Sequence, residues 1–155
     1  LIDDLLSLAR EGKLVGDMEP VELDELVVSC WDGVANVKAT LHVDEKSPTI
    51  KADKSRLRQL LENLFRNAVQ HGGEDVTVTV GALDDGFFIE DDGLGIPEED
   101  RDMVFEPGKS TSDDGTGFGL AIVRGITEAH GWSITVTDGT DGGSRFEITS
   151  VDFPE

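Results

Sequence analysis

One long amphipathic helix constrains the fold of this chain more than any other feature of its sequence. From Asp53 to His71 the apolar residues recur at the spacing of one helix face, and Gly72-Gly73 ends the pattern. The apolar positions are Leu57, Leu60, Leu61, Leu64, Phe65, Ala68 and Val69. A helix with such a stripe has to bury it, so we expect this helix to pack against the core of a domain.

The rest of the sequence predicts shorter elements around that helix. Helical spacing indicates helices at residues 22–34 and 118–130, and a short helical turn near 98–104. The expected strands are residues 40–43, 48–51, 76–80, 87–90, 132–137 and 144–151. A polar turn at 44–47 would join the first two strands, and Asp84-Asp85-Gly86 is typical of a hairpin turn between the next two. A length of 155 residues suits one domain with one core.

The charge of the chain excludes some classes of partner. Thirty-three acidic residues against 13 basic residues give a net charge of -20, which argues against nucleic acids and anionic membrane surfaces as direct partners. The acidic residues are spread along segments with clear apolar periodicity, so they predict a solvated acidic surface and not a disordered tail. Such a surface resembles those of proteins from salt-loving organisms.

Two absences in the sequence indicate a soluble, cytoplasmic fragment. No apolar run approaches the ~20 residues of a membrane span, and the first residues lack the basic start and apolar stretch of a secretory leader. The single cysteine, Cys30, lies in an apolar helical run and is expected to be an inert core residue. A parent chain could still be attached to a membrane by another segment.

The long helix also carries a polar edge. Asn63 and Asn67 lie one turn apart beside the apolar stripe, and Gln70 and His71 continue the same side. Amide oxygens are suitable ligands for Mg²⁺, a hard cation that prefers oxygen and bridges phosphates. Taken alone, the same residues are also typical of a helix flank of solvated amides.

Two glycine-rich segments adjoin predicted elements at points where ligands bind. Asp91-Asp92-Gly93-Leu94-Gly95 comes directly after a strand, so a carboxylate lies beside backbone that a ligand can approach closely. Gly115-Thr116-Gly117-Phe118-Gly119 comes directly before a helix, where free N–H groups and the positive helix end favour an anion. It is neither a Walker loop nor a Rossmann fingerprint. A plain turn and a hinge without a ligand are the alternative interpretations of the two segments.

In this order and spacing, the three elements resemble the ATP site of the Bergerat-fold family, which includes histidine kinases, type II topoisomerases, a heat-shock chaperone and mismatch-repair ATPases. The matching segments are the N box at 62–68, the first glycine box at 91–96, the F box at 104–107, the second glycine box at 115–120 and the third at 142–146. The F box, the Ala121-Ile122-Val123 run and the Glu128-Ala129-His130-Gly131 ending point to the histidine kinase branch. Residues 1–10 are similar to the end of the dimerisation helix in those kinases.

The resemblance implies an α+β fold, in which a mixed, mostly antiparallel sheet of about five strands packs on three helices in a two-layer α/β sandwich. It also implies a division of the chain. Residues 1–12 would be the end of the dimerisation and phosphoacceptor helix. Residues 13–155 would be the ATP-binding catalytic domain, with a lid over the nucleotide at about 105–117.

Roles for individual residues follow from the same resemblance. Asp91 would accept a hydrogen bond from the adenine amino group, Ser144 would complete the adenine pocket, and Asn67 would hold Mg²⁺ against the triphosphate. The glycines would let the backbone approach the nucleotide and donate N–H groups to phosphate oxygens. The full ATP-binding set is Asn63, Asn67, Gln70, His71, Asp91, Gly93, Gly95, Ile96, Lys109, Gly115, Thr116, Gly117, Phe118, Gly119, Leu120 and Ser144, with ATP and Mg²⁺ as cofactors.

Asn63, at the catalytic position, indicates whether the resemblance implies phosphate transfer or ATP hydrolysis. Hydrolytic relatives carry a glutamate four residues before the metal-binding asparagine, and an amide cannot act as that base. Transfer of the γ-phosphate to a histidine is therefore favoured. None of His42, His71 and His130 is followed by the residues of the family's acceptor box, so the acceptor is expected on a dimerisation domain outside this chain.

The resemblance also implies partners. They are the dimerisation and phosphoacceptor domain of the same parent kinase and the receiver domain of a response regulator. The parent is expected to be a homodimer and the fragment a monomer, with no nucleic acid and no direct membrane contact.

Two departures from the family pattern keep alternatives open. Gln70 stands where a lysine is frequent and Gly108 where an aromatic residue is usual, with Lys109 or Arg66 as possible substitutes for the missing charge. The alternatives are an ATP-hydrolysing member of the fold and a degenerate module that senses nucleotide or docks a partner.

Overall fold

The computed structural model describes most of the chain. The described residues are Gly16, 18–34, 39–44, 48–72, 75–93, 119–139 and 142–154, of which Val34, 70–72 and Gly119 are described by their backbone alone. Three expectations therefore lie outside the described residues: the helix end at 1–12, the helical turn at 98–104 and the lid at 105–117.

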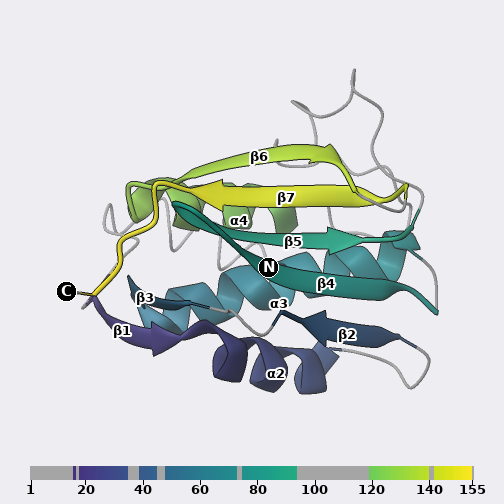
Figure 1. The fold of residues 1–155 in the computed structure, drawn as a ribbon, viewed down its shortest axis with the longest axis horizontal. Helices are drawn as coiled ribbons and strands as arrows, with labels where there is room; N and C mark the ends of the chain where they lie inside the picture. Colours follow the sequence, from purple (N-terminus) through teal and green to yellow (C-terminus); the bar gives the residue numbers. More distant parts are fainter. Residues whose placement is uncertain are drawn as a thin grey trace.

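Along the described chain, single helices are separated by pairs of strands, with the labels of Figure 1. The helices are α2 (Leu23–Val34), α3 (Lys54–Gly72) and α4 (Gly119–Ala129). The strands are β1 (Glu19–Glu22), β2 (Thr40–Val43), β3 (Thr49–Ala52), β4 (Thr77–Leu83), β5 (Gly86–Asp91), β6 (Ser133–Asp138) and β7 (Ser144–Thr149).

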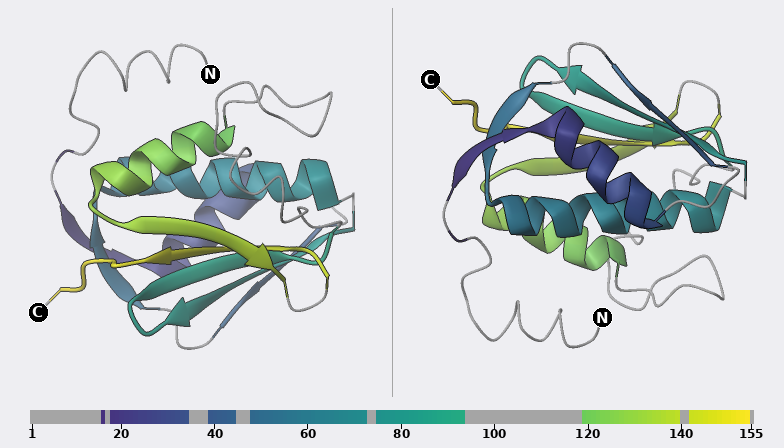
Figure 2. Two further views of the ribbon diagram at one scale, coloured as in Figure 1. Left: turned by 90° about the horizontal axis from the view of Figure 1, so that it is seen from above. Right: turned by 90° about the horizontal axis from the view of Figure 1, so that it is seen from below.

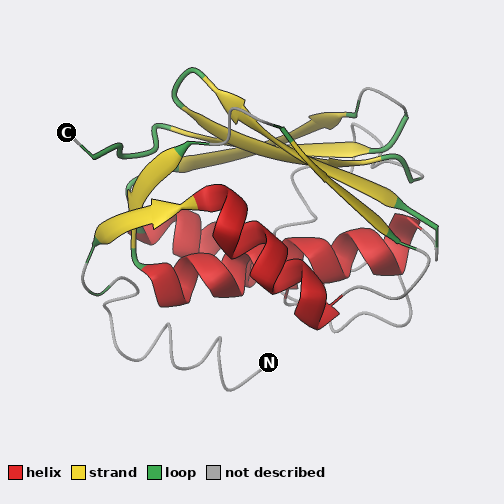
Figure 3. Ribbon diagram, turned by 60° about the horizontal axis from the view of Figure 1, so that its bottom comes forward, coloured by secondary structure: helices red, strands yellow, loops and turns green. Residues whose placement is uncertain are grey.

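The main sheet has five strands in the order β2-β4-β5-β7-β6. The β2–β4 pair is parallel, and the other three pairs are antiparallel. All three helices lie against one face of this sheet, as the edge-on view in Figure 3 shows. The predicted two-layer α+β sandwich is confirmed. None of the helices in the described part of the chain combines the length and the apolar character that a membrane span requires.

The first two predicted strands both form, but they belong to different sheets. The strands predicted at 40–43 and 48–51 do not pair with each other: β2 joins the main sheet beside β4, and β3 pairs with β1 in a separate two-stranded sheet. The Glu19-Pro20 step begins β1. Pro20 is tolerated there because a two-stranded sheet consists of edges, where one missing N–H donor costs little.

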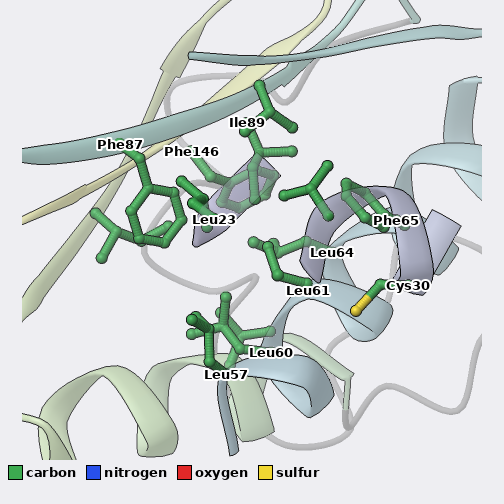
Figure 4. Close-up of a cluster of buried hydrophobic side chains, with 14 of the residues drawn as sticks. Leu23, Cys30, Leu57, Leu60, Leu61, Leu64, Phe65, Phe87, Ile89 and Phe146 are labelled. Carbon is green, nitrogen blue, oxygen red and sulfur yellow. The ribbon is translucent and has the colours of Figure 1, made fainter. Parts of the chain in front are cut away.

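The core lies between α3 and the helix-facing side of the sheet, where the leucines of α3 meet the phenyl rings of the strands (Figure 4). Alternation along β5 sends Phe87 and Ile89 toward the helices, as the strand period of two requires. The Trp31 ring of α2 packs edge-on against Phe65, with centroids 5.3 Å apart. The α3 stripe is thus buried as its periodicity predicts.

Cys30 belongs to this core, as expected. Its side chain has no exposed surface, and burial raises the pKa of the thiol to about 11. Arg58 lies close enough to lower the thiol pKa, although by less than burial raises it. At neutral pH the thiol is protonated and poorly nucleophilic.

Candidate functional site

The end of β5 and the start of β7 meet at one edge of the molecule, on the right in Figure 1. The Asp91 carboxylate lies there, half-buried, and its Oδ1 accepts hydrogen bonds from the Gly93 N–H at 2.9 Å and the Ser144 N–H at 3.4 Å. Ser144 itself is buried. Two residues 53 positions apart in sequence are thus brought together by the β5–β7 pairing.

The turn between β6 and β7 packs tightly on the backbone of Asp91. A Cβ atom on Gly143 would overlap the Asp91 carbonyl oxygen, and one on Gly139 would lie 3.0 Å from the same oxygen. Gly142 has a φ of 97°, a conformation that residues with a side chain rarely adopt. The glycines of this turn therefore let it approach the end of β5, where it holds Ser144 against Asp91.

A charged cluster occupies the opposite face of the same two strands. The Arg145 guanidinium donates to Glu90 at 3.2 Å and to Glu147 at 2.8 Å, and it lies 3.8 Å from the centroid of the Phe88 ring. Glu90 and Arg145 are directly opposite each other in the β5–β7 register. This cross-strand pair reinforces the register that places the next residues, Asp91 and Ser144, side by side.

The second half of α3 supplies the amide side of the candidate site. Asn63 is 7% exposed, and its Nδ2 donates to the Gln59 carbonyl at 2.7 Å, which fixes the side chain along the helix. Asn67, one turn later, is half-buried. Gln70 and His71 belong to the last turns of α3, but their side chains lie outside the description.

The phosphate side of the predicted site is described only at its border. The α4 helix begins at Gly119, and the half-buried Leu120 packs against the core. The remaining predicted ligands lie outside the described residues: Gly95, Ile96, Lys109, Gly115, Thr116, Gly117 and Phe118.

Two supporting features were missed from the sequence. The contact of Gly143 with Asp91 depends on strand register, so no local pattern reveals it. The Glu90–Arg145 pair likewise becomes visible only once β5 and β7 are known to be neighbours.

A protein family described as histidine kinase-, DNA gyrase B-, and HSP90-like ATPase matches residues 52–155 of this chain. The matched segment is most of the chain and contains α3, Asp91 and Ser144. The chain belongs to this ATPase family.

Curated proteins with similar sequences include sensor histidine kinases. Sensor histidine kinase ZraS of Escherichia coli K12 is 32% identical over an alignment that covers 96% of this chain and 34% of ZraS. Sensor histidine kinase YkoH of Bacillus subtilis is 30% identical, over 88% of this chain and 33% of YkoH. The chain thus spans about a third of the length of these relatives.

Solved structures with a similar fold are also histidine kinases. The mycobacterial sensor histidine kinase MprB superposes with a TM-score of 0.76 at 27% identity, covering 89% of this chain and 99% of that one. The catalytic domain of histidine kinase ThkA gives 0.72 at 25% identity, covering 90% and 98%. Full-length ShkA in complex with AMPPNP gives 0.77 at 29% identity, covering 99% of this chain and 35% of that one. The described fold is that of histidine kinase catalytic domains.

Proposed function

We propose that this chain is the ATP-binding catalytic domain of a two-component sensor histidine kinase, which transfers the γ-phosphate of Mg-ATP to a histidine on a separate dimerisation domain. The observation that carries the proposal is the Asp91 carboxylate, held at the end of β5 by the N–H groups of Gly93 and Ser144. In a member of this ATPase family, that carboxylate is the group that reads the base.

Asp91 gives the site its selectivity for adenine. A carboxylate accepts a hydrogen bond from the 6-amino group of adenine, whereas guanine presents a carbonyl oxygen at the same ring position. Two oxygens that face each other without a proton between them repel each other, and both lose their hydrogen bonds to water when the nucleotide binds. GTP is therefore rejected.

The polar edge of α3 provides the residues proposed to lie beside the metal and the terminal phosphate. The Asn67 amide oxygen would hold Mg²⁺, which would neutralise charge on the triphosphate. Asn63 is an amide and cannot take a proton from water. Its hydrogen bond to Gln59 keeps it aligned with the helix axis. Transfer to a histidine, which is itself a nucleophile, needs no such base.

The acceptor is proposed to come from another domain. His42 lies exposed on β2, and His130 is buried at the end of α4. The histidine kinase names of the similar proteins support a dimerisation domain in a homodimeric, cytoplasmic or membrane-attached parent, and a response regulator that takes the phosphate onward. Residues 1–12 are proposed to be the end of that dimerisation helix.

The test is a calorimetric titration of the chain with ATP and GTP, with and without Mg²⁺. We expect ATP to bind at least about tenfold more tightly than GTP, and Asp91→Asn to weaken ATP binding by about 10- to 100-fold, since a charge-assisted hydrogen bond contributes about 1.5–3 kcal/mol. Asp92→Asn is the matched control, because Asp92 is exposed and its Oδ1 accepts from the Thr77 N–H, away from the site.

Two outcomes would redirect the proposal. Absence of ATP binding at millimolar nucleotide favours a degenerate docking module. Release of inorganic phosphate by the chain alone, without any acceptor histidine, favours an ATP-hydrolysing enzyme.

A further inference from the structure

Three segments of the chain meet at Asp53, immediately before α3. The Oδ1 atom of Asp53 accepts from the N–H groups of Ser55 at 3.1 Å and Arg56 at 3.3 Å. These are the bonds of a helix N-cap, which satisfy N–H groups that the helix leaves without partners. One carboxylate oxygen thus serves the helix.

The other oxygen serves the start of the described chain. The Oδ2 atom of Asp53 accepts from the N–H of Gly16 at 2.7 Å, across 37 residues of sequence. A carboxylate acceptor makes such a bond stronger than one between neutral groups. Gly16 is otherwise exposed, and the first element, β1, begins only at Glu19. Asp53 therefore fixes the chain before it enters the sheet.

The backbone of Asp53 is tied to the end of α4. Its N–H donates to Nε2 of His130 at 3.1 Å, and Nδ1 of His130 donates to the Ile126 carbonyl at 2.9 Å. His130 is buried against the Trp132 ring, with centroids 4.2 Å apart. Burial lowers the pKa of His130, which keeps Nε2 available as an acceptor at neutral pH.

Both helices that reach the candidate nucleotide site are therefore fixed at this junction. The α4 helix begins at Gly119, beside the predicted phosphate loop, and ends at the junction roughly 16 Å away at 1.5 Å per residue. The α3 helix begins at the junction and carries Asn63 and Asn67 in its second half. Figure 2 shows the two helices side by side, with the end of α4 next to the start of α3.

We propose that Asp53 is a positioning residue, which fixes the point where the segment before Gly16 joins the ATPase domain and thereby the orientation in which the domain presents ATP to the acceptor histidine. This inference rests on the proposed function. Loss of the Gly16–Asp53 bond would remove this constraint on Gly16, three residues before β1, and would let the domain change its orientation relative to the segment before it. A misplacement of about 1 Å at the reacting atoms costs up to about 100-fold in rate.

Two variants remove the bond from opposite sides. Asp53→Asn keeps an oxygen for the N-cap, since Asn caps as well as Asp, but its amide nitrogen cannot accept from Gly16. Gly16→Pro removes the donor N–H and leaves Asp53 unchanged. Gly16→Ala is the control, because it keeps the N–H and places its Cβ 3.3 Å from Oδ2 of Asp53, a tight contact that a small shift relieves.

The first measurement is the ¹⁵N order parameter of the Met18 amide in the 155-residue chain. We expect a rigid value near 0.85 in the wild type and in Gly16→Ala, and a value below about 0.6 in Asp53→Asn and Gly16→Pro. A flexible Met18 in the wild type, or a rigid Met18 in both variants, would show that the Gly16–Asp53 bond does not fix the chain before β1.

The second measurement is histidine phosphorylation by the parent kinase at saturating ATP. Asp53→Asn and Gly16→Pro are expected to slow it by about tenfold with ATP affinity changed by less than about twofold, while Gly16→Ala keeps the wild-type rate. Unchanged rates, or a parallel loss of ATP affinity, overturn the positioning role. A wild-type parent that binds ATP but phosphorylates no histidine refutes the proposed function. In that case the order parameter of Met18 alone still tests whether the Gly16–Asp53 bond fixes the chain before β1.

Discussion

At the scale of the residue, His130 shows how burial and hydrogen bonding set the state of a titratable group. Burial lowers the pKa of His130 below its ordinary value of 6.5, and the Ile126 carbonyl and the carboxylates of Asp53 and Asp152 oppose this shift only in part. The Nδ1 atom of His130 hydrogen-bonds the Ile126 carbonyl and so caps the end of α4. Its bond to Asp53 was not foreseeable, because the partner is 77 residues away.

The lowered pKa predicts a pH dependence of stability. The folded chain favours the neutral imidazole, so the unfolded chain binds more protons at pH values between the two pKa values. The free energy of unfolding should therefore fall as pH drops below 6.5 and stop falling below the pKa of the folded state. Urea unfolding between about pH 5 and about pH 8 measures this slope.

The control for that prediction is His130→Gln, which keeps a polar side chain that does not titrate in this range. Carboxylates elsewhere contribute to the slope in both proteins, so the difference between the two slopes isolates His130. Parallel slopes would mean that His130 does not lose its proton on folding.

At the scale of the element, the turn between β6 and β7 predicts that one glycine supports both nucleotide binding and stability. Gly143→Ala places a methyl group against the Asp91 carbonyl, so the turn must retreat and carry Ser144 with it. We expect ATP affinity to fall by about tenfold or more and the free energy of unfolding to fall by about 1–3 kcal/mol.

Calorimetry and thermal unfolding together check the Gly143 prediction. Gly33→Ala on α2 is the control, because among the described residues nothing beyond its chain neighbours and its own helix backbone lies within 4 Å of the added Cβ, and alanine favours helix. That variant should bind ATP as the wild type does. Wild-type affinity in Gly143→Ala would show that the turn does not position the adenine site.

The elements that sequence predicts well are those with local signals. The apolar repeat predicted a helix at 53–71, and α3 spans Lys54–Gly72. The Asp84-Asp85-Gly86 turn predicted the β4–β5 hairpin, which forms. The strands β2 and β3 were predicted, but no local signal gave their partners, and the structure places them in two different sheets. Asp91 and Ser144 were chosen by family resemblance, and only strand register shows why they meet.

At the scale of the whole molecule, the net charge makes stability depend on salt concentration. A net charge of -20 on 155 residues repels itself in the compact state. Because the Debye length shrinks from about 10 Å at 0.1 M salt to about 3 Å at 1 M, raising the salt concentration should screen this repulsion. We expect the thermal midpoint to rise over that range.

The salt prediction is checked by thermal unfolding in sodium chloride, with a sucrose series of matched osmolality as the control for general solute effects. A midpoint that does not change between low and molar salt would count against the comparison with proteins of salt-loving organisms.

Among the described residues, the strand order β2-β4-β5-β7-β6 leaves one side of β2 and one side of β6 without a neighbouring strand in the main sheet. Such open sides are where separate molecules can add strand to strand and grow into fibres. In this chain β2 is only four residues long, and β6 exposes Thr135, Thr137 and the carboxylate of Asp138. Every approaching copy also brings the same -20 charge. The charge that weakens each folded molecule thus also keeps concentrated copies of it from assembling edge to edge.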